Sequence, residues 1–186
     1  MFDLTFTIET KDGTTPLTLA IDQAVIAGWT GRDPVARDKH IAELEAIGIA
    51  RPASTPIYYR CSARRLTTED EIEVCGGNSS GEVEFVLIGW QGRIFVGLGS
   101  DHTDRKVEGY SVTVSKQMCD KPIASTLWEL EEVIGHWDRM ILRSYAWIGG
   151  ERELYQEGTL DAMLPVSELL ARGFADGKLP DGCAMF

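Results

Sequence analysis

Residues 81–88 constrain the fold of this chain more than any other stretch of the sequence. They alternate like a β-strand, and they carry two carboxylates, Glu82 and Glu84, at positions i and i+2. Because side chains alternate across a strand, both should point to the face that also carries Val86 and Ile88. Desolvation and mutual repulsion oppose two like charges on an apolar face, and a bound cation removes both penalties. We therefore predict that Glu82 and Glu84 are metal ligands; the alternative is an exposed edge strand on which glutamates prevent aggregation.

The composition fits a globular chain with one substantial core. Its 186 residues are 44% hydrophobic and 25% charged, so we expect a single domain over residues 1–186, with an N-terminal hairpin region at 1–28. Eighteen Lys+Arg against 29 Asp+Glu give a formal net charge of -11. Nucleic acids and anionic membranes require a basic face, so we expect neither as a partner. The acidic balance also suits a protein that holds a divalent cation, although acidic surfaces are common for solubility alone.

The cysteines and the N-terminus indicate a cytoplasmic protein. The chain has four cysteines without a CxxC pair or metal-ligand spacing, and we interpret them as reduced thiols. The N-terminus has no basic region followed by an apolar core, so it does not resemble a secretory signal. No apolar run approaches the roughly 20 residues of a membrane span.

Local patterns predict more strands than helices. Alternation predicts strands at residues 2–9, 16–21, 56–61, 71–74, 82–88, 93–97, 139–148 and 151–156. Asp33 and Pro34 predict the start of a helix that ends at about residue 47. A capping box at 126–129 predicts a second helix, and residues 166–172 a short final one. The expected class is α+β, predominantly β, with an antiparallel or mixed sheet.

Several short motifs follow one another in a recognisable order. Glu82-x-Glu84 precedes a glycine-rich strand that ends in Asp101-x-Thr103-x-Arg105, and a lysine follows at 116. The flanking motifs are Gly31-Arg32 with His40-x-x-Glu43, the strand at 56–60, and the segment Gly149-Gly150-Glu151 with Gln156-x-Gly158-Thr159. In this order they resemble the fumarylacetoacetate hydrolase (FAH) superfamily, from about residue 31 to the C-terminus. The resemblance implies an FAH-like mixed β-sheet roll with a few short helices.

The resemblance also implies a metal held by three carboxylates, Glu82, Glu84 and Asp101. Oxygen-only ligation suits Mg²⁺, Mn²⁺ or Ca²⁺ and disfavours structural zinc. Asp104 is a candidate to support these ligands without touching the metal, and the alternative is an ordinary turn residue. We interpret His102 as structural rather than as a ligand.

His40 and Glu43 are the candidate acid–base pair. At helical spacing they share a face with Leu44, which places them on the apolar side of the expected helix. In the FAH superfamily such a pair activates water, so the resemblance implies catalytic roles for both. The alternative is a solvated pair on the rim of the helix.

Four further residues receive roles from the resemblance. Lys116 is implied to stabilise negative charge on the substrate. The aspartate that follows this lysine in the family motif lies one residue later in this chain, so Lys121 remains an alternative for the role. Arg32, Gln156 and Thr159 are implied to bind the substrate. For the last two, the alternative is ordinary polar residues of a hairpin.

The implied function is that of a divalent-metal-dependent hydrolase. It would cleave a C–C bond in a small-molecule carboxylic acid, a 1,3-dicarbonyl or 2-oxo acid, through a metal-bound enolate. Two alternatives remain open: a lyase, hydratase, decarboxylase or isomerase that uses the same enolate, and an inactive metal-stabilised binding or assembly module. The resemblance also implies a homodimer.

The last residues, 179–186, resemble a strand of the FAH superfamily after which further strands normally follow. We therefore expect either a truncated chain or a sheet that is completed differently. Truncation would leave an unpaired sheet edge and weaken the site.

Overall fold

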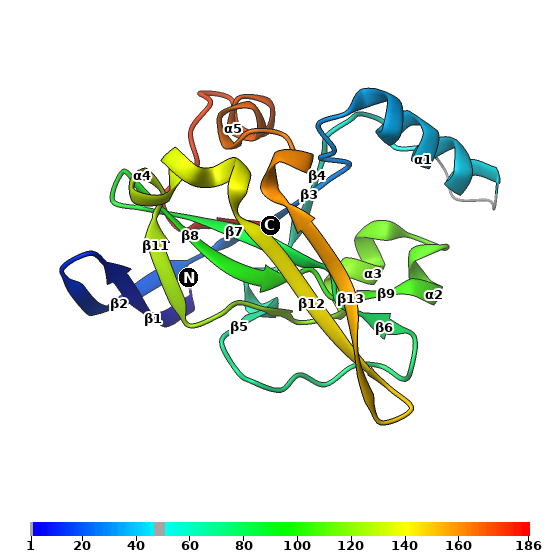
Figure 1. Ribbon diagram of the computed structural model, residues 1–186, viewed down its shortest axis with the longest axis horizontal. Coiled ribbons are helices and arrows are strands. Elements are labelled where there is room, and N and C mark those ends of the chain that lie inside the picture. Colours follow the sequence, from blue (N-terminus) through cyan, green and yellow to red (C-terminus); the bar gives the residue numbers. More distant parts are fainter. Residues whose placement is uncertain (1, 47–50) are drawn as a thin grey trace.

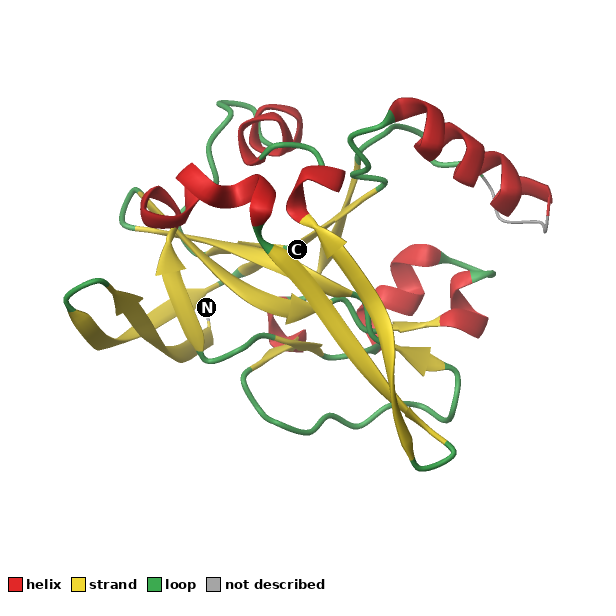
Figure 2. Cartoon of the chain, viewed as in Figure 1, coloured by secondary structure: helices red, strands yellow, loops and turns green. Residues whose placement is uncertain are grey.

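The computed structural model describes residues 2–46 and 51–186, and its main feature is a curled sheet of eight strands (Figures 1 and 2). Its strands are β1 (Phe2–Thr10), β2 (Gly13–Ile21), β3 (Gln23–Gly28), β4 (Ile57–Cys61), β7 (Val83–Trp90), β8 (Arg93–Ser100), β11 (Thr126–Glu129) and β14 (Cys183–Met185). They lie in the order β2-β1-β11-β8-β7-β14-β3-β4. The pairs β1–β11 and β14–β3 are parallel and the others antiparallel, so the sheet is mixed, as predicted.

Shorter elements surround this sheet. Three two-stranded ladders join β5 (Leu66–Thr67) to β10 (Lys121–Pro122), β6 (Ser79–Ser80) to β9 (Thr103–Asp104), and β12 (Ile141–Ile148) to β13 (Glu151–Thr159). The α-helices are α1 (Pro34–Ala46), α2 (Arg105–Glu108), α3 (Val112–Met118), α4 (Leu130–Val133) and α5 (Val166–Gly173). The 3-10 helices are η1 (Ala63–Arg65), η2 (Ile134–Arg139) and η3 (Leu160–Ala162). Strands therefore dominate the described residues, and the expected α+β class is confirmed.

Strand β7 is buried on both faces, and its alternation divides the core in two. Val86 and Ile88 pack in one cluster, which residues from β1, β2, β3 and β8 complete because the sheet curls around it. Phe85 and Leu87 pack on the opposite face, under η2, η3 and α5. This period of two is the expected geometry of a strand. It holds the N-terminal end of β7, where the two glutamates lie, at a defined position.

Several predicted elements are confirmed. β1 and β2 form the N-terminal hairpin, and β12 and β13 form a second hairpin about Gly149 and Gly150, both of which have positive φ. Helix α1 begins at Pro34, and the side chain of Asp33 accepts a hydrogen bond from the backbone N–H of Val35 at 2.8 Å. The predicted end of this helix at residue 47 lies outside the described residues. Helix α5 confirms the predicted final helix.

The predicted start of the second helix, at 126–129, is wrong, although helical structure follows from Leu130. These residues form β11, which pairs with β1 through Leu127 and Ile8 and with β8 through Trp128 and Val96. Leu127 is fully buried in the core. Two flanking strands thus outweigh a local capping pattern, and the helix begins only at Leu130.

The predicted strand at 71–74 is also wrong. These four residues have no regular secondary structure, and Val74 is largely exposed. The segment carries two glutamates, and among the described residues it joins no strand ladder. A short run with β propensity is not stable without a partner strand.

Near the C-terminus, β14 lies inside the sheet rather than at an edge. It pairs with β3 on one side and with β7 on the other, so residues 183–185 do not form the unpaired edge that one of the two alternatives implied. The chain that leads into β14 passes close to Gly89 of β7. A Cβ atom at Gly89 would lie 2.3 Å from the carbonyl oxygen of Pro180, so only glycine fits there. The turn between β7 and β8 consists of Gln91 and Gly92.

Of the helices in residues 2–46 and 51–186, none has the length and hydropathy that crossing a membrane requires.

Candidate metal centre

Glu82, Glu84 and Asp101 come from the paired ends of β7 and β8. The ladder places Glu84 opposite Gly99, and the backbone N–H of Asp101 donates to the carbonyl of Glu82 at 2.9 Å. Glu82 and Asp101 are therefore cross-strand neighbours, and Glu84 lies one pleat further along. Gly99 lacks a Cβ atom, which would lie 2.5 Å from Cγ2 of Val86 and 2.7 Å from the ring of Phe186.

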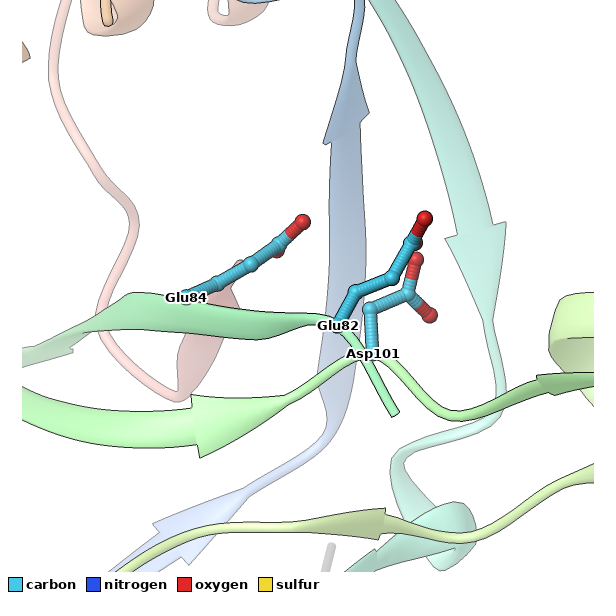
Figure 3. A group of neighbouring side chains, drawn as sticks. All are labelled: Glu82, Glu84 and Asp101. Carbon is cyan, nitrogen blue, oxygen red and sulfur yellow. The ribbon is translucent and has the colours of Figure 1, made fainter. Parts of the chain in front are cut away.

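The three carboxylates converge, as the sequence predicted. One oxygen from each residue lies within 4.8 Å of the others. Figure 3 shows the three side chains pointing into the same space from the two neighbouring strands. This is the separation expected for oxygen ligands of one ion, each at about 2.0–2.6 Å from it.

Asp101 is fully buried between two ammonium groups. Nζ of Lys116 hydrogen-bonds Oδ2 of Asp101, and Nζ of Lys121 lies 3.3 Å from Oδ1. Lys121 also donates to the carbonyls of His102 and Cys119, so its donors are used within the protein interior. Lys116, on α3, instead borders the open space beside the carboxylates.

Glu82 and Glu84 differ in their partners. Glu82 pairs with Arg105 at 3.0 Å and lies 3.7 Å from Nζ of Lys116. Within the described part of the chain, Oε2 of Glu84 is buried and has no hydrogen-bond partner. Burial raises the pKa of Glu84 well above its ordinary value, and the neighbouring carboxylates of Asp101 and Glu82 raise it further.

This donor set fits a hard divalent cation. The ligands are carboxylate oxygens only, and a buried, unpaired oxygen of Glu84 faces two further carboxylates. A cation would provide that oxygen with its missing partner and remove the like-charge repulsion. Glu82, Glu84 and Asp101 are the residues that would hold it.

Lys116 is the buried cation of this site. Burial alone would lower the pKa of Lys116, but the charges of Asp101 and Glu82 outweigh it and raise the pKa. Its ammonium group lies 6.0 Å from the ring centroid of Tyr59. Between the two lysines that the sequence left open, Lys116 is the one that reaches the cavity.

A cavity of about 520 Å³ joins these groups to α1 and to the hairpin β12–β13. This volume is in the range of about 300–1,000 Å³ that is typical for small-molecule sites. Its lining includes the three carboxylates, Lys116, Arg105, His40 and Gln156. A larger hollow of about 690 Å³ lies between η2 and α5, but the carboxylate group does not border it. The smaller cavity is therefore the candidate functional site.

The His40–Glu43 pair is on the correct helix but is loosely held. The atoms Nδ1 of His40 and Oε2 of Glu43 are 3.6 Å apart, and the side chains are 61% and 59% exposed. The expected placement on an apolar, inward side is thus not observed. His40 nevertheless lines the cavity, and its ring lies 5.7 Å from that of Trp29. Catalytic roles for the pair stay predictions.

Of the three predicted substrate-binding residues, only Gln156 lines the cavity with the carboxylates. Its Oε1 atom accepts from the backbone N–H of Val83 and from the hydroxyl of Ser144, both at 2.9 Å. The side-chain nitrogen of Gln156 is therefore its available donor.

Arg32 and Thr159 lie elsewhere. Arg32 forms a two-pronged ion pair with Asp138, at 2.8 and 3.1 Å, and donates to the carbonyl of Met163. The hydroxyl of Thr159 hydrogen-bonds Asp161 at the surface. Neither borders the cavity that contains the carboxylates, and their substrate contacts remain predictions.

Two neighbours of the motif also have defined places. Asp104 is the N-cap of α2, where it accepts from the backbone N–H groups of Lys106 and Val107 at 3.0 and 2.9 Å. His102 hydrogen-bonds Ser100 at 3.1 Å, and burial lowers its pKa. Both therefore support the local structure.

Sequence reasoning assigned no role to several residues that line the cavity, among them Arg37, Tyr59 and Arg105. Arg105 ends the Asp-x-Thr-x-Arg motif, and its ion pairs with Glu82 and Glu108 were not assigned from it. Arg37 precedes His40 by three residues, a spacing that places both on one side of a helix. Tyr59 lies on a strand whose orientation the sequence did not predict.

Comparisons with known proteins identify a family and a fold for this chain. A family model described as "Protein of unknown function (DUF2848)" matches residues 27–186. No curated protein matches the chain.

Three solved structures illustrate the similarity of fold. A proposed fumarylpyruvate hydrolase from Burkholderia cenocepacia is 18% identical with a TM-score of 0.62, over 97% of this chain and 77% of that chain. A proposed isomerase from Escherichia coli is 16% identical with a TM-score of 0.63, over 97% and 85%. The apo form of 2-keto-3-deoxy-D-arabinonate dehydratase is 11% identical with a TM-score of 0.58, over 95% and 65%. At these identities the likeness shows a shared fold and not a shared reaction.

Proposed function

Since the chain belongs to the DUF2848 family and has the fold of the FAH superfamily, we propose that it is a divalent-metal-dependent hydrolase that cleaves a C–C bond in a 1,3-dicarbonyl or 2-oxo acid. The observation that carries this proposal is the trio Glu82, Glu84 and Asp101, within 4.8 Å of one another beside a buried lysine in a cavity. Enzymes of one fold differ in reaction, so the argument rests on these groups.

The ion that fits the trio is Mg²⁺, Mn²⁺ or Ca²⁺. When bound, such an ion acts as a Lewis acid that polarises a substrate oxygen. A carboxylic acid with a neighbouring carbonyl group suits this chemistry.

Lys116 and Arg105 supply the fixed positive charge of the site. Lys116 is 8% exposed at its side chain, so its ammonium group acts in a site with little competing water. Arg105 is held between Glu82 and Glu108, at 3.0 and 3.2 Å. Lys116 would stabilise the negative charge that develops on the substrate oxygen, and Arg105 would orient Glu82.

His40 is the candidate group for moving the proton. In the hydrolysis of an acylpyruvate, the oxygen of water bonds to the acyl carbonyl carbon, and the C–C bond to the pyruvate methylene breaks. The electron pair of that bond becomes a pyruvate enolate, which takes a proton at carbon. His40, adjacent to Glu43, would accept the proton from water and return one to that carbon.

A lyase or decarboxylase acting on 2-oxo acids is the second candidate. The exposed and loosely paired His40 and Glu43 favour it, because a reaction without water requires no activating dyad. The trio and Lys116 would suffice for loss of carbon dioxide from a 2-oxo dicarboxylate such as oxaloacetate.

The test uses both types of substrate with the purified full chain in Mg²⁺ or Mn²⁺. Acetylpyruvate is followed by the loss of its enol absorbance, and oxaloacetate by the formation of pyruvate. Reactions run in water labelled with oxygen-18 distinguish the candidates, because hydrolysis places one label in the released acetate. Decarboxylation incorporates no oxygen atom from water when its C–C bond breaks.

Two matched variants and a chelator serve as controls. We expect EDTA and Glu84→Gln to remove turnover, and the exposed Glu73→Gln to leave it unchanged. Turnover that persists in EDTA and in Glu84→Gln would contradict the metal-dependent proposal. If neither substrate is converted, the chain is better described as a metal-stabilised binding module.

A further inference from the structure

One side of α1 faces the cavity. Arg37, His40 and Leu44 line it at positions i, i+3 and i+7, while Ile41 on the adjoining side is buried at 1% exposure. This spacing is the continuous face of a helix. Arg37 therefore enters the cavity from a different element than the carboxylates, which come from β7 and the end of β8.

The side chain of Arg37 is mostly buried, and its guanidinium has only weak partners. Its side chain is 16% exposed, and in residues 2–46 and 51–186 its Nε atom has no hydrogen-bond partner. The nearest carboxylate oxygen, on Asp38, is 3.6 Å from Nε, and one terminal nitrogen donates to the carbonyl of Gly31 at 3.5 Å. A buried Nε–H donor without an acceptor is costly, and an anion bound at the guanidinium would supply the acceptor.

The charges that line the cavity also favour an anion at Arg37. Four carboxylates line it, on Glu82, Glu84, Asp101 and Glu108, together with the three permanent cations Arg37, Arg105 and Lys116. A divalent cation at the trio changes this balance from one net negative charge to one net positive charge. Arg105 and Lys116 already pair with carboxylates of the cavity, whereas Arg37 does not.

We propose that Arg37 determines specificity by binding a second carboxylate, so that the substrate is a dicarboxylic 2-oxo acid. The first carboxylate and its neighbouring carbonyl would lie at the trio, and the second would form a two-pronged pair with the guanidinium of Arg37. This inference rests on the proposed function, because it takes the trio as the reacting end of the site.

The test measures binding, so that it does not depend on turnover. The probes are 2-oxoglutarate and 2-oxopentanoate, which have the same number of carbons but carry two carboxylates and one. Titration calorimetry in Mn²⁺ compares their affinities for the wild type, Arg37→Met and Arg37→Lys. Lys39→Met is the matched control, because Lys39 is on the same helix, is 78% exposed and does not line the cavity.

We expect the wild type to bind 2-oxoglutarate at least about tenfold more tightly than 2-oxopentanoate, as for a charge-assisted pair. Arg37→Met should remove this difference, Arg37→Lys should restore part of it, and Lys39→Met should keep it. Equal affinities in the wild type, a preference that survives Arg37→Met, or no binding of either acid would overturn the inference. A clear preference without turnover of any 2-oxo acid would instead contradict the proposed function alone.

Discussion

Lys116 and Asp101 form a buried ion pair in the wall of the cavity, and Lys121 approaches the other oxygen of Asp101 at 3.3 Å. One carboxylate thus lies between two ammonium groups, of which only that of Lys116 also borders the cavity. Among the described residues, Oδ1 of Asp101 has this charge contact but no hydrogen-bond partner, whereas Oδ2 accepts a hydrogen bond from Lys116. This arrangement gives Lys116 a role in both stability and chemistry.

Lys116→Met should therefore impair both. We expect the free energy of unfolding without metal to fall by about 3–5 kcal/mol, because a buried carboxylate loses its partner. Turnover should fall by about 10²–10³-fold, the usual effect of removing a charge-stabilising group. Urea unfolding and steady-state kinetics measure the two effects.

The control for this change is Lys106→Met, at an exposed lysine of α2. It removes the same charge outside the cavity and should alter neither quantity. Full turnover in Lys116→Met would show that Lys116 has no role in catalysis.

Glu84→Gln should stabilise the metal-free protein. Burial and the charges of Asp101 and Glu82 raise the pKa of Glu84, so the ionised form is unfavourable in the folded state. Neutralising it should increase the free energy of unfolding without metal by about 1–3 kcal/mol. The same variant should lose the rise in melting temperature that Mg²⁺ or Mn²⁺ produces in the wild type.

The raised pKa of Glu84 also predicts how the stability of the metal-free protein depends on pH. Because the folded pKa of Glu84 lies above its unfolded value of about 4.3, its contribution favours folding at low pH. That contribution is lost as the pH rises from the unfolded towards the folded pKa. Between these two pKa values, we expect the free energy of unfolding of the metal-free wild type to fall relative to that of Glu84→Gln. If the two free energies differ by the same amount at every pH, the raised pKa of Glu84 is contradicted.

His40→Ala should reduce turnover without changing stability. His40 lies on an exposed part of α1, so its loss should change the free energy of unfolding by less than about 0.5 kcal/mol. Loss of a general base should reduce turnover by about 10²–10⁴-fold in a hydrolase. His136→Ala, at an exposed histidine outside the cavity, is the control. Unchanged turnover in His40→Ala would favour the water-independent lyase.

Gly89→Ala should destabilise the sheet. Its added Cβ atom would meet the carbonyl oxygen of Pro180 at 2.3 Å, and this oxygen belongs to backbone that cannot easily shift. We expect a loss of about 3 kcal/mol or more, as for an overpacked core position. Gly77→Ala, where no atom lies within 4 Å of the new Cβ, should cost much less in the same denaturant titration.

The cysteines should differ sharply in reactivity. Cys75 is exposed, whereas Cys61, Cys119 and Cys183 are buried, and burial raises the pKa of Cys183 to about 12. At pH 8 a thiol reagent should therefore modify one cysteine quickly and the others only after unfolding. Cys75→Ser should remove the fast phase, and rapid modification of a second thiol in the native protein would contradict the packing.

The carboxylate trio was predictable because its geometry is local. Glu82 and Glu84 share a side through strand alternation alone. Asp101 was implied by the family resemblance, and the ladder between β7 and β8 places it beside them. The hairpin about Gly149 and Gly150 was predictable for the same reason, since turn residues separate two alternating runs.

The errors occur where distant parts of the chain decide the structure. Leu127 has a helical pattern around it but pairs with Ile8, a contact that no local window contains. Arg37 has a helical spacing to His40, yet which side of α1 meets the cavity depends on the strands below it. The ion pair of Arg32 was likewise not foreseen, because its partner Asp138 lies far along the chain.

The position of β14 has a consequence for how this protein folds during synthesis. Its three residues, near the C-terminal end of the sequence, fill the middle of the sheet between β7 and β3. Both neighbouring strands emerge from the ribosome long before it does. The nascent chain must therefore keep the facing backbone groups of β3 and β7 unpaired, and exposed to association with chaperones or other chains, until residues 183–185 have been synthesised.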